Sequence, residues 1–187
     1  MILDIFKTSI YKTSIKNIEY INYFTDLLKI QKDSNNINYI SNVGGFQSQS
    51  LNTINDDIKE NLFIKPAIEY IKQFNKNYKI ELYNYWINCN NKNDHNLLHN
   101  HLGCNISGVY YVKAPENSGR IVFQNGDLTK MNSTNQFYFD DANFYARYFV
   151  PIIQYDLILF SSDTFHYVEP NKSNEERISV AFNLILK

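Results

Sequence analysis

The second half of the sequence is a series of short segments separated by turn-forming residues, and this pattern limits the fold more than any other feature. Strands are expected near residues 78–89, 97–102, 106–113, 119–124, 135–139, 144–149, 155–160, 164–168 and 176–186. Turn signals such as Asn125-Gly126-Asp127 and Pro170-Asn171 lie between them. Many short, regularly spaced strands are typical of a sandwich, a jelly roll or a barrel. The sequence therefore predicts a mainly β (α+β) fold.

The first part of the chain has helical periodicity instead. One helix is expected over 17–32, with Asn17 as its N-cap and Ile18, Ile21, Phe24, Leu27 and Leu28 facing inward. A second helix or helix pair is expected over 53–75, with Pro66 at a kink or a new first turn. Its inward residues would be Ile54, Ile58, Leu62, Ile68, Ile71 and Phe74.

The segments that flank these helices predict a single domain. Residues 1–6 are expected to form an edge strand, and residues 41–48 a loop around the pair Gly44-Gly45. No repeat or linker divides the 187 residues. We expect one domain over 1–187, with helical support from 1–76 and a β core from 78–187.

Composition excludes several classes of partner. The net charge is −1 and no block of like charge occurs, so nothing indicates a nucleic-acid or membrane partner. Two cysteines are too few for a disulfide framework, and no apolar segment resembles a leader or a membrane span. We expect a cytoplasmic protein, in the host cytoplasm if a phage encodes it. The 15 Tyr and 13 Phe are compatible with a homodimer.

Histidine is scarce, and three of the four histidines fall in two stretches. His99 and His101 are two residues apart, so on a strand both side chains point to one face. With His166 from a distant strand they would form a three-ligand site with open positions, which suits iron. His95, in the expected polar loop 90–96, is interpreted as an ordinary surface residue.

Arg177 stands in an otherwise apolar run, where a buried guanidinium needs an anionic partner. A ligand carboxylate matches its planar fork, and Ser179 projects to the same face. The alternative is a structural ion pair with Glu175 or Asp163. Tyr110 and Tyr111 point to opposite faces of a strand, so one of the two phenols could reach the same anion, and Asn88 is a weaker polar candidate. Packing alone also explains residues of these types in strands. Cys104 is interpreted as an inert thiol.

These residues carry a family resemblance. The pattern runs His99-x-His101, Ser107-Gly-Val-Tyr-Tyr111, Asp156 to Ser162, His166-x-Val168-x-Pro170-Asn171 and Arg177-Ile-Ser-Val-Ala-Phe-Asn183. It resembles the 2-oxoglutarate- and Fe(II)-dependent oxygenases, most closely the small 2OG-Fe(II) oxygenase family of bacteria and phages, and covers roughly residues 40–187. The resemblance implies a double-stranded β-helix (jelly roll, cupin-like) with N-terminal supporting helices.

The resemblance also implies the chemistry. His99, His101 and His166 would bind Fe(II), and Arg177 would pair with the distal carboxylate of the co-substrate 2-oxoglutarate, helped by Ser179 and Tyr111. Asn88 is a further polar candidate for that site. With O2 the protein would act as a dioxygenase that hydroxylates an unknown substrate and forms succinate and CO2. We expect loops 90–96 and 125–135 to line the substrate pocket.

The chain departs from most of the superfamily at His101, where a carboxylate is usual. Three neutral imidazoles would leave the iron with two positive charges instead of one. In one alternative, Asp94 or Asp163 completes the triad and His101 lies outside it. Two other functions remain open: a metal-binding jelly-roll module without turnover, and a cupin-type three-His dioxygenase that does not use 2-oxoglutarate.

Overall fold

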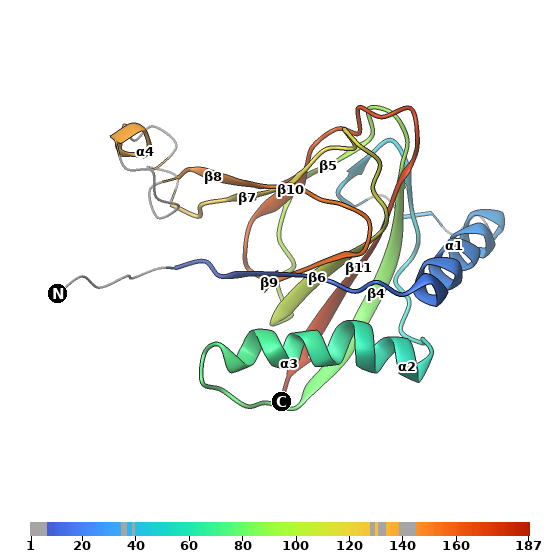
Figure 1. Cartoon of the computed structure of the whole chain (residues 1–187), viewed down its shortest axis with the longest axis horizontal. Helices are drawn as coiled ribbons and strands as arrows, with labels where there is room; N and C mark the ends of the chain where they lie inside the picture. The colour runs from blue at the N-terminus through green and yellow to red at the C-terminus, as the bar shows by residue number, and fades with distance from the viewer. Residues whose placement is uncertain (1–6, 35–36, 39, 128–129, 131–133, 139–144) are drawn as a thin grey trace.

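Two antiparallel β-sheets form the framework of the protein (Figure 1). The computed structural model describes residues 7–34, 37–38, 40–127, 130, 134–138 and 145–187. In the larger sheet the strand order is β1 (Ile10–Ser14), β9 (Asp156–Ser161), β6 (Ile106–Lys113), β11 (Arg177–Leu186), β4 (Ile80–Asn90) and β3 (Phe46–Gln47). In the smaller sheet it is β2 (Asn42–Val43), β5 (His95–His99), β10 (His166–Val168), β7 (Ile121–Gln124) and β8 (Arg147–Val150). The predicted mainly β jelly roll is confirmed.

The alternation of side chains along the strands divides the interior into two cores. In β9, Leu157 and Leu159 pack toward the helices, whereas Ile158 and Phe160 pack toward the smaller sheet. The central strands of the larger sheet are apolar on both faces because both faces are covered, as expected for a doubly packed sheet. One face of β11 departs from this rule: Arg177 and Ser179 point away from the helices, and both are buried.

Helices cover the outer face of the larger sheet (Figure 1). Helix α1 (Ile18–Asp33) begins as predicted, with the side chain of Asn17 accepting from the backbone N–H of Glu19. The second helical segment runs through α2 (Asp56–Ile58), a π-helical stretch η1 (Lys59–Ile64) and α3 (Lys65–Lys72). Pro66 lies in the first turn of α3, where its missing N–H is tolerated because the wider π-helical turn comes immediately before it.

Several predicted details are wrong. Ile18 and Phe74 are exposed. Phe24 and Leu28 of α1 are buried as predicted, and Tyr20 and Gln31 are buried although they were not among the predicted inward residues. Residues Asn135–Tyr138 form a short helix, α4, where a strand was expected. The strand predicted near 97–102 is shifted to His95–His99, so His95 and Asn96 lie in β5 and not in a loop. The edge strand predicted over 1–6 lies outside the described residues, and β1 forms one edge of the larger sheet.

The segment predicted as a glycine-containing loop connects the two sheets. Its first half is strand β2 of the smaller sheet and its second half is strand β3 of the larger one. Gly44 and Gly45 join them with φ of +67° and +64°, a conformation that favours glycine. A Cβ on Gly45 would lie 2.7 Å from the carbonyl oxygen of Cys89. The glycine pair therefore lets the chain cross between sheets beside the end of β4.

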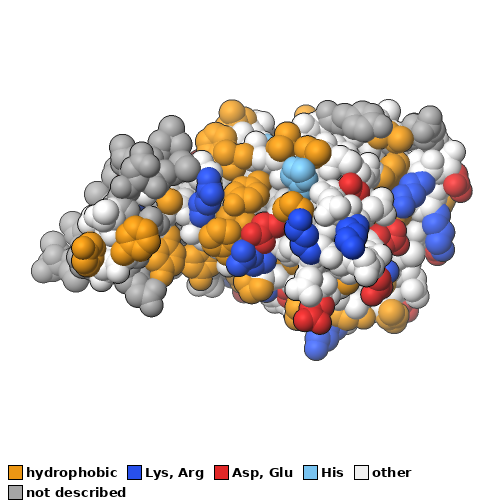
Figure 2. Space-filling model, turned by 90° about the horizontal axis from the view of Figure 1, so that it is seen from above, with side chains coloured by type: hydrophobic (Ala, Val, Ile, Leu, Met, Phe, Trp, Pro, Cys, Tyr) orange, Lys and Arg blue, Asp and Glu red, His pale blue; other side chains and the backbone are white. Residues whose placement is uncertain are grey.

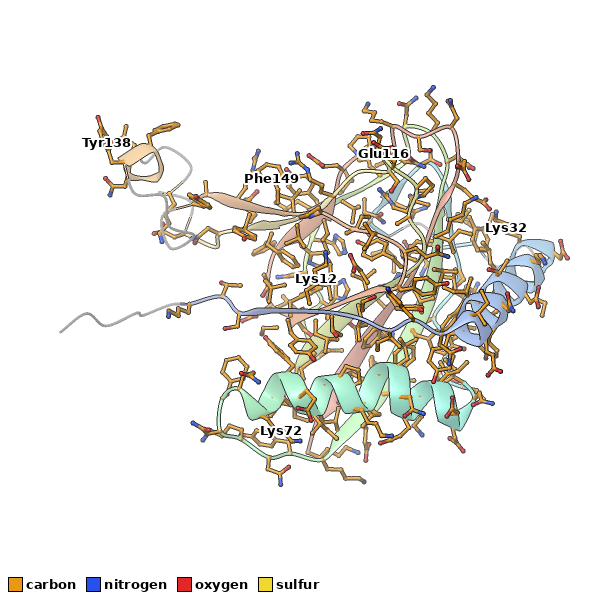
Figure 3. The ribbon with its side chains drawn as sticks, viewed as in Figure 1. Lys12, Lys32, Lys72, Glu116, Tyr138 and Phe149 are labelled. Atoms are coloured by element: carbon orange, nitrogen blue, oxygen red, sulfur yellow. The ribbon has the colours of Figure 1, made fainter. Side chains whose placement is uncertain are left out.

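The surface carries charges of both signs. Figure 2 shows lysines and arginines interspersed with acidic side chains on one face, without a large area of a single sign. Several are paired: Lys12 of β1, labelled in Figure 3, lies 2.8 Å from Asp156 and ties the edge strand to β9. Within the described residues, no helix is long and apolar enough to span a lipid bilayer.

Candidate active site

Three histidines meet between the two sheets. His99 ends β5, His166 begins β10, and the antiparallel pairing of these strands sets the two residues opposite each other. His101 follows two residues after His99. The ring centroids are 4.3 Å apart for His99 and His166, and 5.1 Å apart for each of the other two pairs. One ring nitrogen from each residue lies within 4.8 Å of those of the other two.

Hydrogen bonds determine which nitrogen each histidine presents. Nδ1 of His99 lies 2.7 Å from the carbonyl oxygen of Leu97, and Nδ1 of His166 lies 3.0 Å from that of Thr164. Carbonyl oxygens only accept, so each Nδ1 must carry the proton and donate. Nδ1 of His101 lies 2.7 Å from Oδ1 of Asn183 and donates in the same way. All three Nε2 atoms therefore keep a lone pair, as metal-binding histidines require.

Burial keeps these imidazoles neutral. It lowers the pKa of His99, that of His101 to about 4 and that of His166 to about 3, and the neighbouring imidazoles add to the lowering for His101 and His166. Neutral imidazole is the form that binds a divalent metal. The cluster thus fits a metal ion by both its tautomers and its protonation state.

These pKa values predict acid sensitivity of the metal-free protein. Unfolded histidine titrates near 6.5, so below that pH the unfolded chain binds protons that folded His101 and His166 do not. The free energy of unfolding should fall as the pH drops below about 6.5, by up to about 1.4 kcal/mol per pH unit for each histidine. Urea denaturation at pH 7.5 and 5.0 measures this loss. A double variant, His101→Gln with His166→Gln, should show a flatter profile; an equally steep one would contradict the assignment.

Asn183 connects His101 to a buried hydrogen-bond network. Ser107 Oγ donates to Asn183 Oδ1 at 2.8 Å and lies 2.8 Å from Ser162 Oγ. The Asn183 amide nitrogen donates to Asn84 Oδ1 at 2.9 Å. These contacts orient the amide so that its oxygen faces the imidazole.

Asn183→Leu is expected to lower the affinity for Fe(II) about 10- to 100-fold, as is typical when a histidine ligand loses a hydrogen-bond partner. Asn183 Oδ1 is the closer acceptor for His101 Nδ1, since Ser107 Oγ lies farther from it, at 3.0 Å. Asn183→Asp is the matched control, because a carboxylate still accepts from Nδ1–H of His101. Anaerobic Fe(II) titration against a competing chelator measures both variants. Equal affinity of Asn183→Leu and the unaltered protein would show that the amide does not position the ring.

Arg177 lies in the cavity beside the histidines and lacks a carboxylate partner among the described residues. The residue is 1% exposed, and its Nη1 donates to the carbonyl oxygens of Ser118 and Glu169. Its Nη2 is buried without a hydrogen-bond partner. Glu175, one proposed partner, pairs instead with Lys113 at 3.1 Å. An unpaired buried guanidinium nitrogen is costly, and an anion of matching shape would satisfy it.

Further polar groups without partners lie in the same cavity. The hydroxyl of Tyr111 and the side-chain oxygen of Asn88 are buried and unbonded. Burial raises the pKa of Tyr111 far above its ordinary value, although nearby Arg177 opposes the shift, so the phenol remains a donor. Ser179 lines the same cavity. The structure thus brings together the seven residues predicted to bind iron or the co-substrate: His99, His101, His166, Arg177, Ser179, Tyr111 and Asn88.

The alternative ligands and partners lie elsewhere. Among the described residues, the metal-binding cluster contains the three histidines and no carboxylate. Asp94 accepts from the backbone N–H of Asn91, and its charge acts on Arg177 from a distance beyond an ion pair. His95 points its Nδ1 to the carbonyl of Asn93, away from the cluster.

Sequence reasoning missed several residues of this site. Asn183 was part of the recognised pattern, but an asparagine on a strand carries no distinctive chemical signal. Trp86 lines the cavity two residues before Asn88, and strand alternation could have placed it there. Asn96 and Ser41 also line the cavity, and Asn96 belongs to the segment expected to border the substrate.

Comparison with known proteins agrees with this arrangement. A family model described as "Putative 2OG-Fe(II) oxygenase" matches residues 84–183, a range that includes the three clustered histidines and Arg177. No curated protein matches the chain significantly.

Solved structures share the fold at low sequence identity. A prolyl-4-hydroxylase of Pseudomonas putida is 11% identical with a TM-score of 0.63, and the match covers 94% of this chain and 92% of the hydroxylase chain. The non-heme alpha-ketoglutarate-dependent carbocyclase SnoK from nogalamycin biosynthesis is 12% identical with a TM-score of 0.65, and the match covers 96% of this chain and 80% of the SnoK chain. HygX from Streptomyces hygroscopicus, solved with nickel and 2-oxoglutarate, is 12% identical with a TM-score of 0.63, and the match covers 95% of this chain and 81% of the HygX chain. The match over more than half of the sequence shows that this chain belongs to the 2OG-Fe(II) oxygenase family, whose members use Fe(II), 2-oxoglutarate and O2.

Proposed function

We propose that the protein is an Fe(II)- and 2-oxoglutarate-dependent dioxygenase that hydroxylates its substrate. One observation carries the proposal: three neutral imidazoles and an unpaired buried guanidinium share a cavity. When bound, Fe(II), 2-oxoglutarate and O2 supply the oxidation, in which the co-substrate becomes succinate and CO2 and the substrate gains a hydroxyl group. His99, His101 and His166 would hold the metal through Nε2.

The remaining residues would bind the co-substrate. Arg177 offers Nη2 to the distal carboxylate, and the Tyr111 hydroxyl and Ser179 hydroxyl can donate to the same group. Asn88 contributes a further polar contact. Phe160, Val109 and Ile121 line the same cavity and restrict water, which strengthens electrostatic attraction there.

The absence of a carboxylate from the described cluster affects the charge balance. Three neutral ligands leave a divalent ion with both positive charges, whereas a carboxylate would cancel one. A doubly charged centre attracts an anionic co-substrate more strongly. The same donor set also fits a three-His dioxygenase that works without 2-oxoglutarate, but that function leaves Arg177 and Ser179 without a ligand.

An anaerobic titration tests the proposal. Fe(II) is added to metal-free protein, followed by 2-oxoglutarate, and the weak visible charge-transfer band of a keto acid chelated to iron is recorded. The band, together with succinate release after admission of O2, is the expected result. Iron binding without the band would reject the 2-oxoglutarate function in favour of the three-His dioxygenase or a non-catalytic metal module.

A further inference from the structure

A second cavity of about 280 Å³ opens beside the histidines. It shares Ser41, Trp86, His99 and His101 with the cavity that holds Arg177, so the two meet at the proposed metal site. The volume is close to the lower end of the range for small-molecule sites. A group bound here would lie next to the metal, on a different side from the co-substrate carboxylate.

Uncharged side chains line this second cavity. Its described lining contains no lysine, arginine, aspartate or glutamate, and consists of amides, hydroxyls, aromatic rings, a few aliphatic side chains and the thiol of Cys104. The first cavity differs, because it contains Arg177. With 2-oxoglutarate bound, the two negative charges of the co-substrate offset those of the divalent metal, and the side chains that line the second cavity offer no counter-charge. A charged group that enters it would therefore lose its hydration without compensation, which is costly. The lining therefore favours a neutral ligand.

Gln47 gives this cavity a polar side chain whose oxygen lacks a hydrogen-bond partner. The residue lies in β3, is 3% exposed, and its side-chain oxygen is buried without a partner. No described residue bonds to its side-chain nitrogen either. An amide carries an acceptor and a donor side by side, and the buried oxygen of Gln47 without a partner destabilises the protein. A planar ligand amide would satisfy both atoms at once, whereas a single hydroxyl has less suitable geometry for both.

Apolar surface borders this amide. The rings of Trp86 and Tyr83 line the cavity, and Ile40 and Leu102 also line it while remaining 72% and 77% exposed. An uncharged chain that alternates apolar groups with amides would contact both kinds of surface. Peptide backbone and neutral carboxamides have this chemistry.

We propose that the second cavity binds the primary substrate through a neutral amide group that pairs with Gln47. This inference rests on the proposed function, because it treats the site beside the histidines as the place of substrate oxidation. It assigns the specificity for an uncharged amide to Gln47 and the contact with the substrate's apolar part to Trp86.

The chain contains a built-in probe for this test. Trp86 is its one tryptophan, so intrinsic fluorescence reports on the cavity directly. Zn(II)-loaded protein with 2-oxoglutarate is titrated with N-acetyl amino-acid amides, with the corresponding free amino acids, and with methyl glycosides. Zinc has no redox chemistry, so no turnover occurs. We expect the neutral amides to change Trp86 emission at concentrations at least about 10-fold below those needed for the zwitterions.

Two glutamine variants separate substrate binding from folding. Gln47→Leu should raise the melting temperature, because it removes a buried unpaired amide, and should weaken binding of the amides about 10-fold. Gln31→Leu is the matched control: Gln31 also has a buried unpaired oxygen but lies in α1, outside this cavity. It should leave amide binding unchanged.

Each outcome decides the proposal. Equal binding of zwitterions, preferential binding of methyl glycosides, or unchanged amide binding by Gln47→Leu would overturn it. Small amides and longer acetylated peptides, compared in the same assay, distinguish a free carboxamide from a peptide segment as the source of the amide. The assay is independent of the iron–keto acid band, so failure of the substrate assignment and failure of the proposed function can be told apart.

Discussion

Arg177→Met is expected to weaken 2-oxoglutarate binding by roughly 150- to 4000-fold, which corresponds to the roughly 3–5 kcal/mol typical of losing one partner of a buried ion pair. Methionine fills much of the same space, so the loss reflects the missing fork of N–H donors. Affinity for Fe(II) should be unchanged, since Arg177 does not contact the metal-binding nitrogens. Titration of the iron–keto acid band measures the co-substrate affinity, and a chelator competition measures that for iron.

A structural role of Arg177 has to be separated from this effect. Its Nη1 donates to the carbonyl oxygens of Ser118 and Glu169, so Arg177→Met should also lower the melting temperature. Arg177→Lys keeps the charge but loses the bidentate fork, and should bind 2-oxoglutarate with intermediate affinity. Arg147, an exposed arginine of β8, provides the control Arg147→Met, which should behave as the unaltered protein. Unchanged co-substrate affinity in Arg177→Met would reject the assignment.

The site was predictable from residue types that are scarce in the sequence or unusual in their surroundings. Only four histidines occur, and an arginine within an apolar strand signals a buried charge that needs a partner. Strand alternation then placed Ser179 on the same face as Arg177. It also placed Tyr110 and Tyr111 on opposite faces of their strand: Tyr111 faces the cavity, whereas the hydroxyl of Tyr110 donates to the carbonyl of Ile15 on the helix side. The residue patterns therefore indicated both the fold class and the polar cavity.

Other features depend on tertiary pairing that local patterns do not encode. A period of two shows which residues share a face, but not which sheet a short strand joins, so the crossing at Gly44-Gly45 appeared as a loop. The segment that contains Gln47 has few apolar residues and no strong strand signal. Its place beside the histidine cluster follows from pairing with the far end of β4, where Gln47 lies opposite Asn88.

His166→Ala is expected to lower the affinity for Fe(II) by more than about 100-fold and to abolish 2-oxoglutarate-dependent succinate formation, because loss of a direct ligand exceeds the 10- to 100-fold effect of its hydrogen-bond partners. His166 is 4% exposed, its Nδ1–H donates to the Thr164 carbonyl, and no described residue forms a hydrogen bond with its Nε2. Anaerobic chelator competition measures the first effect, and succinate analysis the second.

His95 makes this test unusually well controlled. Of the four histidines in the sequence, it is the one whose ring is not part of the cluster, although it lies in β5, the strand that ends at His99. His95→Ala should leave iron affinity and succinate formation unchanged, whereas the same substitution at His99, His101 or His166 should lower iron affinity by more than about 100-fold and abolish succinate formation. The metal-free His166→Ala protein should also lose less stability between pH 7.5 and 5.0, because one neutral buried imidazole is gone. Equal iron affinity of the His95 and His166 variants would place the metal elsewhere, whereas selective loss in the three cluster variants would establish a three-imidazole centre in which His101 replaces the usual carboxylate.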